Sequence, residues 1–250
     1  MSKGKLQKFA EMETFPNVFQ YPFAVLKEQG FPLKGRWHAD YFRNDNPITL
    51  ELGCGKGEYT VGLARQYPDR NFIGIDIKGA RMYTGAKQAV DEGLTNVAFL
   101  RTHIEFVEHF FAADEVEQLW LTFSDPQMKN PRKRLTSTYF LNRYRHFLVD
   151  GGLIHVKTDS RFLYTYTRLM AEHNHLPMPM LTDDLYASHL PVPPIQTYYE
   201  QQWLSWGITI KYLCLQLPRE GDLTESGAEI PLDDYRSYHR NKRSSKDTAR

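Results

Sequence analysis

Between residues 48 and 173, short apolar runs alternate with longer segments whose apolar residues recur at helical spacing. Such alternation is typical of repeated strand and helix units, which build a parallel sheet covered by helices. The predicted strands are residues 48–52, 71–75, 97–101, 118–123 and 152–157, and the predicted helices are residues 57–67, 79–92, 104–110, 136–147 and 160–173. We therefore expect an α/β fold with a mostly parallel, doubly wound sheet.

The two ends of the chain and the segment after residue 173 break this alternation. Residues 176–200 are rich in proline and irregular, and residues 207–217 then read as a strand with an alternating face. Residues 1–46 and 220–250 show no periodic pattern. We predict an N-terminal extension over residues 1–46, one α/β domain over residues 47–219 and a basic C-terminal tail over residues 220–250.

The composition permits one sizeable core and argues against several classes of protein. The 250 residues are 41% hydrophobic, which suits a single α/β domain with short appendages. No run of about 18 apolar residues occurs, and the N-terminus lacks the apolar stretch of a secretory signal. Cys54 and Cys214 form no spaced zinc-binding set. We expect a cytoplasmic, soluble protein with no membrane association, no structural metal and no obligatory protein partner.

The net charge of +1 does not by itself indicate a nucleic-acid partner, so polyanion binding depends on local clusters. Three basic clusters occur: Lys3, Lys5 and Lys8; Lys129, Arg132, Lys133 and Arg134; and Arg236, Arg240, Lys242, Arg243, Lys246 and Arg250. The two terminal clusters are consistent either with solvated tails or with arms that bind a polyanion. The last of them is a candidate clamp for nucleic acid.

A glycine-rich loop, ELGCGKG, follows the first predicted strand and opens a helix, as nucleotide-binding loops do. Its glycines alternate at Gly53, Gly55 and Gly57, whereas dinucleotide oxidoreductases favour G-x-G-x-x-G. Glu51 places a negative charge where a pyrophosphate would lie, which argues against NAD and for a cationic ligand such as S-adenosylmethionine. Asp76 ends the second strand, where an acidic side chain can bind ribose hydroxyls.

Two other residues near this loop have less specific interpretations. Cys54 has no neighbouring histidine to activate it, so we interpret it as a small space-filling residue. His103 closes the third predicted strand, where a contact with the adenine base or the methionine end of the ligand is feasible.

The fourth predicted strand runs into SDPQMKNPRKRL, which places Asp125 and Pro126 at the ligand-binding edge of the sheet. An Asp-Pro pair also forms turns and helix caps. The four basic residues that follow would meet phosphates and steer a nucleic-acid substrate if the loop borders a methyl donor. We expect the methyl acceptor to bind beside this loop.

Several motifs occur in a specific order: Glu51-x-Gly-x-Gly-x-Gly, Asp76, Asp125-Pro126 with its Arg-Lys-Arg tail, Thr158-Asp159 and Thr197-Tyr-Tyr-Glu200. With them the sequence resembles the bacterial tRNA (guanine-N7)-methyltransferase family over about residues 45–217. The resemblance implies a Rossmann-like class I methyltransferase fold of about seven strands. It also implies methyl transfer from S-adenosylmethionine to N7 of guanosine 46 in the variable loop of tRNA.

The resemblance implies roles for individual residues of this chain. Cofactor binding is expected from Glu51, Gly53, Gly55, Gly57, Asp76, His103 and Asp125, and substrate binding from Lys129, Asp159, Thr197, Tyr198, Tyr199 and Glu200. Asp125 is the expected catalytic residue. Because N7 of guanine carries a free lone pair, no prior deprotonation is needed. We hypothesise that Asp125 accepts hydrogen bonds from guanine N1–H and N2–H and offsets the charge that develops on the ring.

This chain departs from the family pattern at four positions. Gln127 and Met128 replace the Trp-Pro or Trp-His pair, His103 replaces an acidic residue, and Tyr198 replaces a basic one. Three alternative functions remain: an amino-group methyltransferase acting on another nucleic acid or on protein, a non-catalytic tRNA-binding protein, and a dinucleotide oxidoreductase. The first usually carries a second proline and an aromatic residue after the Asp-Pro position, the second predicts no cofactor binding, and the third predicts NAD binding.

Overall fold

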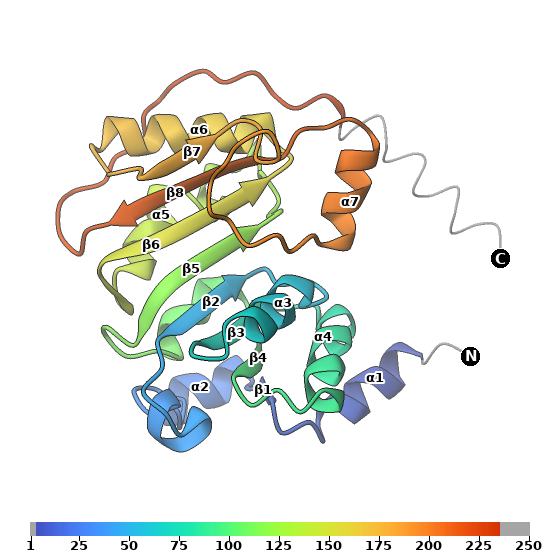
Figure 1. The fold of residues 1–250 in the computed structure, drawn as a ribbon. Helices are drawn as coiled ribbons and strands as arrows, with labels where there is room; N and C mark the ends of the chain where they lie inside the picture. The colour runs from blue at the N-terminus through green and yellow to red at the C-terminus, as the bar shows by residue number, and fades with distance from the viewer. Residues whose placement is uncertain (1–3, 236–250) are drawn as a thin grey trace.

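An eight-stranded sheet organises the fold in the computed structural model, which describes residues 4–235 (Figure 1). Its strands are β1 (Val18–Gln20), β2 (Ile48–Leu52), β3 (Asn71–Asp76), β4 (Val97–Arg101), β5 (Val116–Thr122), β6 (Leu148–Thr158), β7 (Met180–Thr182) and β8 (Lys211–Leu217). They lie in the order β1-β4-β3-β2-β5-β6-β8-β7. The β6–β8 and β7–β8 pairs are antiparallel, and the other five pairs are parallel. The predicted α/β fold with a mostly parallel, doubly wound sheet is confirmed.

The strand order reverses between β2 and β5, which are neighbours although two strands separate them in sequence. From this point the sheet continues through β3 and β4 on one side and through β6 on the other. The loops that leave β2 and β5 therefore diverge at the carboxyl edge and leave a crevice between them.

Helices cover both faces of the sheet. One face carries α1 (Lys5–Met12), α3 (Glu58–Gln66), α4 (Gly79–Asp91) and α7 (Tyr198–Ser205), and the other carries α2 (Phe23–Gln29), α5 (Thr138–Tyr144), α6 (Arg161–His173) and the short helices η1 (Trp37–Phe42) and η2 (Ile104–His109). Strand residues alternate between two cores: Leu119 and Leu121 pack under α5 and α6, and Trp120 packs under α3. The predicted helix over residues 104–110 is a 3-10 helix.

Residues 1–46 contain regular elements although their sequence shows no periodic pattern. Besides α1, α2 and the π-helix η1, this segment supplies β1, which pairs with β4 and extends the sheet. Its apolar residues form an aromatic cluster in which Trp37 is fully buried and its indole N–H donates to the carbonyl of Phe110. A three-residue strand and a π-helix have no sequence period to detect. The domain boundaries predicted at residues 46 and 219 stay predictions.

The segment after α6 also contains elements that the proline-rich sequence concealed. β7 adds an edge strand beside β8, and α7 begins at the Thr197 cap within a stretch expected to be irregular. No helix in the described range, residues 4–235, is long and apolar enough to cross a membrane. The basic residues from Arg236 to Arg250, and Lys3, lie outside that range.

Two glycines set the distance between the glycine-rich loop and α4. A Cβ atom added at Gly85 would lie 2.6 Å from the carbonyl oxygen of Lys56 and 2.9 Å from the Cα atom of Gly57. A Cβ atom at Gly57 would lie 2.6 Å from the ring of Phe99. The loop therefore rests directly on the backbone of α4, and only glycine permits this approach.

We predict that Gly85→Ala lowers the free energy of unfolding by about 1–3 kcal/mol, because overpacking outweighs the gain of about 1 kcal/mol in helix propensity. The measurement is urea unfolding followed by circular dichroism. Thr84→Ala, at an exposed position of the same helix, is the matched control and should be neutral or slightly stabilising. A Gly85→Ala protein as stable as the Thr84→Ala protein would contradict the packing explanation.

Candidate active site

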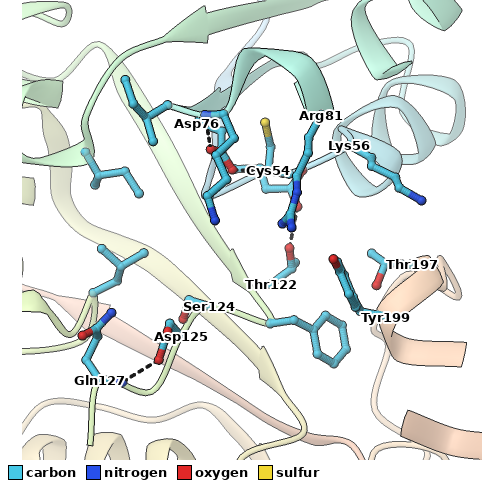
Figure 2. A pocket seen from close by; sticks show the side chains of 18 of the residues that line it. Cys54, Lys56, Asp76, Arg81, Thr122, Ser124, Asp125, Gln127, Thr197 and Tyr199 are labelled. Atoms are coloured by element: carbon cyan, nitrogen blue, oxygen red, sulfur yellow. Dashed lines mark hydrogen bonds between the residues drawn. The ribbon is translucent and has the colours of Figure 1, made fainter. Parts of the chain in front are cut away.

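A pocket of about 560 Å³ opens at the carboxyl edge of the sheet, above the crevice between β2 and β5. Loops after β2, β3, β4, β5 and β6 and the start of α7 form its walls. Figure 2 shows Asp125 and Gln127 across the opening from Asp76 and Arg81. The pocket is lined by nine of the predicted site residues: Glu51, Gly53, Gly55, Asp76, His103, Asp125, Asp159, Thr197 and Tyr199. Its volume suits a small-molecule ligand.

The glycines of the loop have two different roles. Gly53 and Gly55 adopt positive φ angles of 83° and 56°, and a Cβ atom added at either would make no close contact within the protein. Both line the pocket, so their missing side chains leave space beside the backbone for a ligand. Gly57 lies outside the pocket lining and packs against Phe99 and α4. A direct cofactor contact by Gly57 stays a prediction.

Glu51 projects from β2 toward α3 and is 3% exposed. Its Oε2 accepts the backbone N–H of Thr60 at 2.9 Å and also the Thr60 hydroxyl, and its Oε1 accepts the Thr122 hydroxyl at 2.5 Å. Burial raises the pKa of Glu51 to about 7, although these hydrogen bonds favour the carboxylate. A buried carboxyl that titrates near neutral pH can charge when a cation enters the pocket.

Asp76 connects the loop after β2 to the loop after β3, and both loops line the pocket. Its Oδ2 accepts the backbone N–H of Gly55 at 2.9 Å, and its Oδ1 accepts that of Lys78 at 2.7 Å. A carboxylate has about four lone-pair positions, so each oxygen retains one for a ligand hydroxyl. Asp76, for which the sequence predicts a ribose contact, can therefore accept hydrogen bonds from ribose hydroxyls.

Cys54 and His103 both line the pocket, in the loops after β2 and β4. Burial raises the pKa of the Cys54 thiol well above its ordinary value, which keeps the thiol neutral and agrees with a space-filling role. His103 is exposed, lines the pocket after β4 and packs edge-on against Phe106 with ring centroids 5.9 Å apart.

The loop after β5 holds Asp125 in a strained turn. Phe123 and Gln127 have positive φ angles of 52° and 47°, which cost non-glycine residues about 1–3 kcal/mol each. The exposed Asp125 accepts the backbone N–H of Gln127 through Oδ1 at 3.0 Å. Figure 2 shows this bond and the carboxylate at the pocket wall. Strain of this kind persists only where the surroundings fix the backbone.

Arg134 provides that restraint, and the prediction that it contributes a surface charge for phosphates is wrong. The side chain is buried, with Nε 3.0 Å from the carbonyl oxygen of Pro126 and Nη2 3.1 Å from that of Gln127. Its guanidinium lies 3.9 Å from the ring centroid of Tyr166 and 4.8 Å from that of Phe162. Arg134 therefore connects the Asp125 loop to α6.

The other basic residues near the pocket lie at its rim. Lys129, Arg132 and Lys133 are exposed, and of these Lys133 lines the pocket. Sequence analysis missed three further cations in the lining: Lys56, Lys78 and Arg81. They are isolated in sequence, and only the convergence of the loops after β2 and β3 brings them together.

Thr197 and Glu200 start α7 with a reciprocal capping box. The backbone N–H of Glu200 donates to Thr197 Oγ1 at 3.2 Å, and the backbone N–H of Thr197 donates to Glu200 Oε2 at 3.3 Å. Glu200 Oε1 lies 2.7 Å from Lys157 Nζ, and both residues are almost completely buried. The structure thus places Glu200 beneath α7 and outside the pocket lining. A substrate contact by Glu200 stays a prediction.

The two tyrosines of α7 point toward the glycine-rich loop and α4. Tyr198 is 53% exposed, its ring centroid lies 4.3 Å from Lys56 Nζ, and its backbone N–H donates to Glu58. Tyr199 lines the pocket, 6.0 Å from the Arg81 guanidinium. Tyr198 lies outside the lining, so its predicted substrate contact would occur at the rim.

Asp159 follows β6 and is held by the C-terminal part of the chain. Its Oδ2 accepts the hydroxyl of Tyr235 at 2.6 Å, and its backbone carbonyl accepts from Lys211 Nζ at 3.3 Å. Although 1% exposed, it lines the pocket. No group of three or more histidine, cysteine, aspartate or glutamate side chains within residues 4–235 is arranged to bind a metal.

Comparisons with known proteins agree with this architecture. A family described as "Putative methyltransferase" matches residues 45–213. The tRNA (guanine-N(7)-)-methyltransferase of Bacteroides fragilis is 58% identical over 100% of both chains, and that of Porphyromonas gingivalis is 59% identical over 93% of this chain and 98% of its own. The match to the Bacteroides fragilis enzyme therefore includes the N-terminal segment and β8.

The fold is shared with more distant enzymes. A solved 16S rRNA (adenine(1408)-N(1))-methyltransferase from Catenulisporales acidiphilia, determined with cosubstrate SAM, superposes with a TM-score of 0.56. It is 15% identical and covers 78% of this chain and 96% of its own. The Rossmann-like methyltransferase fold is thereby confirmed. By its full-length identity to these relatives, the chain belongs to the tRNA (guanine-N(7)-)-methyltransferase family.

Proposed function

We propose that this chain transfers a methyl group from S-adenosylmethionine to N7 of guanosine 46 in the variable loop of tRNA. One observation supports the proposal: Glu51, Asp76 and Asp125 meet in one pocket of a chain whose full-length relatives are named tRNA (guanine-N(7)-)-methyltransferase. Because tRNA is the proposed substrate, the cytoplasm is the proposed compartment.

The residues of the pocket fit S-adenosylmethionine, which supplies an electrophilic methyl group on a sulfonium centre. Glu51 offers a carboxylate to the ammonium group, and Asp76 offers its free lone pairs to the ribose hydroxyls. Gly53 and Gly55 permit the close approach of the ligand to the backbone. His103 is the proposed contact for the adenine or methionine end.

Asp125 is the proposed catalytic residue because it is the exposed carboxylate on the wall opposite Asp76. It would accept hydrogen bonds from guanine N1–H and N2–H, which directs the opposite edge of the base, with N7, toward the methyl donor. As N7 is alkylated, the ring gains positive charge and the carboxylate attracts it more strongly. Positioning by the rigid loop supplies the remaining rate acceleration.

We predict that Asp125→Ala lowers kcat at least about 100-fold while binding of S-adenosylmethionine remains measurable. Unmodified tRNA and labelled donor give the rate, and borohydride and aniline cleavage, specific for N7-methylguanosine, maps the product. Asp125→Asn, which keeps the shape and loses the charge, should be nearly as inactive. Near-normal methylation by either variant would remove Asp125 from the catalytic role, and cleavage at another nucleotide would reject position 46.

The raised pKa of Glu51, about 7, makes cofactor affinity depend on pH. Only the carboxylate attracts the ammonium group, so binding displaces a proton below pH 7 and affinity rises with pH. Calorimetry should show a dissociation constant about tenfold larger at pH 6 than at pH 7.5. Glu51→Gln should bind weakly at both values, with no such dependence. An equally steep pH profile in Glu51→Gln would show that another group titrates.

Arg134→Lys tests whether the Asp125 loop must be held. A lysine keeps the positive charge but cannot donate to the carbonyls of Pro126 and Gln127 in the same fork geometry. We expect kcat to fall about 10-fold to 100-fold, with little change in cofactor affinity. Arg132→Lys, at an exposed position nearby, is the matched control and should retain its rate. Equal rates for both variants would contradict the positioning role.

A further inference from the structure

A second cavity, of about 750 Å³, opens at the β7 end of the sheet, between α6 and strands β8 and β7. We call it the α6–β7 cleft, and Figure 1 shows α6 over this end of the sheet. Its charged lining residues are Arg161 and Arg168 of α6, Asp183 directly after β7, and Lys211 at the start of β8. Within the described chain it shares no lining residue with the active-site pocket, so it is a separate cavity.

The cleft and the active-site pocket lie close together at the same edge of the sheet. Asp159 lines the pocket, and its backbone carbonyl accepts a hydrogen bond at 3.3 Å from Nζ of Lys211, which lines the cleft. β6 and β7 are both antiparallel to β8, so both end at the carboxyl edge. β5 and β7 are three strand spacings apart, roughly 14 Å. At about 3.4 Å per nucleotide, a nucleic-acid strand covers this distance in about four nucleotides.

Positive charge predominates in the cleft. Three cations, Arg161, Arg168 and Lys211, and one carboxylate, Asp183, line it. Arg168 also pairs at 3.0 Å with Glu172, which lies outside the lining. Three positive charges against these two negative ones leave an excess of one. The cleft therefore favours an anion, and its arginines favour phosphate, because the guanidinium fork can donate to two phosphate oxygens.

The two arginines have hydrogen-bond donors available for a ligand. The exposed Arg161 side chain has no hydrogen-bond or ion-pair partner among residues 4–235. Arg168 uses one of its five N–H groups for Glu172, in an exposed pair of a kind worth at most about 1 kcal/mol. Tyr164 and Thr165, on the same helix, add hydroxyl groups to the lining. These donors lie on α6, a regular element that holds them at fixed spacing.

Lys211 contributes a fixed charge to the cleft. It is 8% exposed, and its Nζ donates to the Asp159 carbonyl, to the Thr209 carbonyl at 2.7 Å and to Thr209 Oγ1 at 3.0 Å. Burial lowers the pKa of Lys211, the carboxylates of Asp159 and Asp233 oppose this effect, and the like charge of Arg161 adds to it. A phosphate bound at Arg161 would offset the repulsion between these two cations.

We propose that the α6–β7 cleft binds a backbone phosphate of tRNA within about four nucleotides of the target guanosine. Arg161 and Arg168 donate hydrogen bonds to the phosphate oxygens, and Lys211 attracts them through its charge. Such a contact fixes the position of the tRNA on the enzyme without reading its sequence. The inference rests on the proposed function, since tRNA is the substrate there. Free inorganic phosphate shares the chemistry of the ligand, and the position of the cleft beside the active-site pocket favours tRNA.

The first test is tRNA binding as a function of salt. Arg161→Gln combined with Arg168→Gln should raise the dissociation constant about threefold to tenfold at 0.1 M salt, and reduce the slope of log affinity against log salt by about 0.7–0.9. The matched control is Arg43→Gln combined with Arg65→Gln, which removes two exposed cations, one before β2 and one at the end of α3, at the opposite edge. The control should keep the wild-type slope. An equal change in both variants, or none in the cleft variant, would overturn the inference.

A tRNA with one uncharged methylphosphonate linkage in place of a phosphate locates the contact. The linkage is moved in turn through about four nucleotides on either side of the target guanosine. At the contacted position it should weaken binding to the wild type about threefold to tenfold. It should leave binding to the cleft variant unchanged, because that variant has already lost the contact. If every linkage weakens both proteins equally, no phosphate is bound at the cleft.

Inorganic phosphate tests the other source of the same chemistry. If calorimetry shows that phosphate binds the wild type and not the cleft variant, while tRNA affinity is the same for both, the cleft is a site for free phosphate and the tRNA assignment is wrong. Mapping of the methylated nucleotide separates this inference from the proposed function. A linkage contact without N7 methylation would reject the proposed function and leave the phosphate contact standing. Normal methylation with unchanged tRNA binding by the cleft variant would reject the phosphate contact alone.

Discussion

The site depends on one buried carboxyl, that of Glu51. It lies at the junction of β2, α3 and β5, and its hydrogen bonds to Thr60 and Thr122 join all three elements. Burying a carboxyl is unfavourable unless its oxygens are hydrogen-bonded, and here both are. The Glu51 carboxyl thus connects three elements and can also change its protonation state near neutral pH, because burial raises its pKa to about 7.

The order of the strands explains why the remaining residues gather around Glu51. Parallel strands release all their following loops at one edge, and the reversal between β2 and β5 separates those loops enough to admit a ligand. Asp76 ends β3, and Asp125 and Asp159 follow β5 and β6, so no two of them are close in sequence. Their convergence is a property of the topology and not of any local motif.

The sequence predicted the central strands and the acidic residues that end them, because strand period and strand ends are local signals. It could not predict that Arg134 turns inward, because a run of basic residues gives no information on which member finds carbonyl and aromatic partners. The T-x-x-E spacing at Thr197 and Glu200 also signals a capping box, which the structure contains, and a substrate contact by Glu200 stays a prediction. The N-terminal elements depend on contacts with β4 and Phe110, which are distant in sequence.

The ion pair between Lys157 and Glu200 has a consequence for ligand binding. Both charges are almost completely shielded from water, so separating them would expose two unpaired charges to the interior, at a cost of about 3–5 kcal/mol. α7 is thus fixed to β6 as part of folding, and the wall that Thr197 and Tyr199 contribute exists before any ligand arrives. The entropic cost of ordering this wall is therefore incurred during folding. A ligand that binds at this side of the pocket meets a preformed surface and does not have to order it.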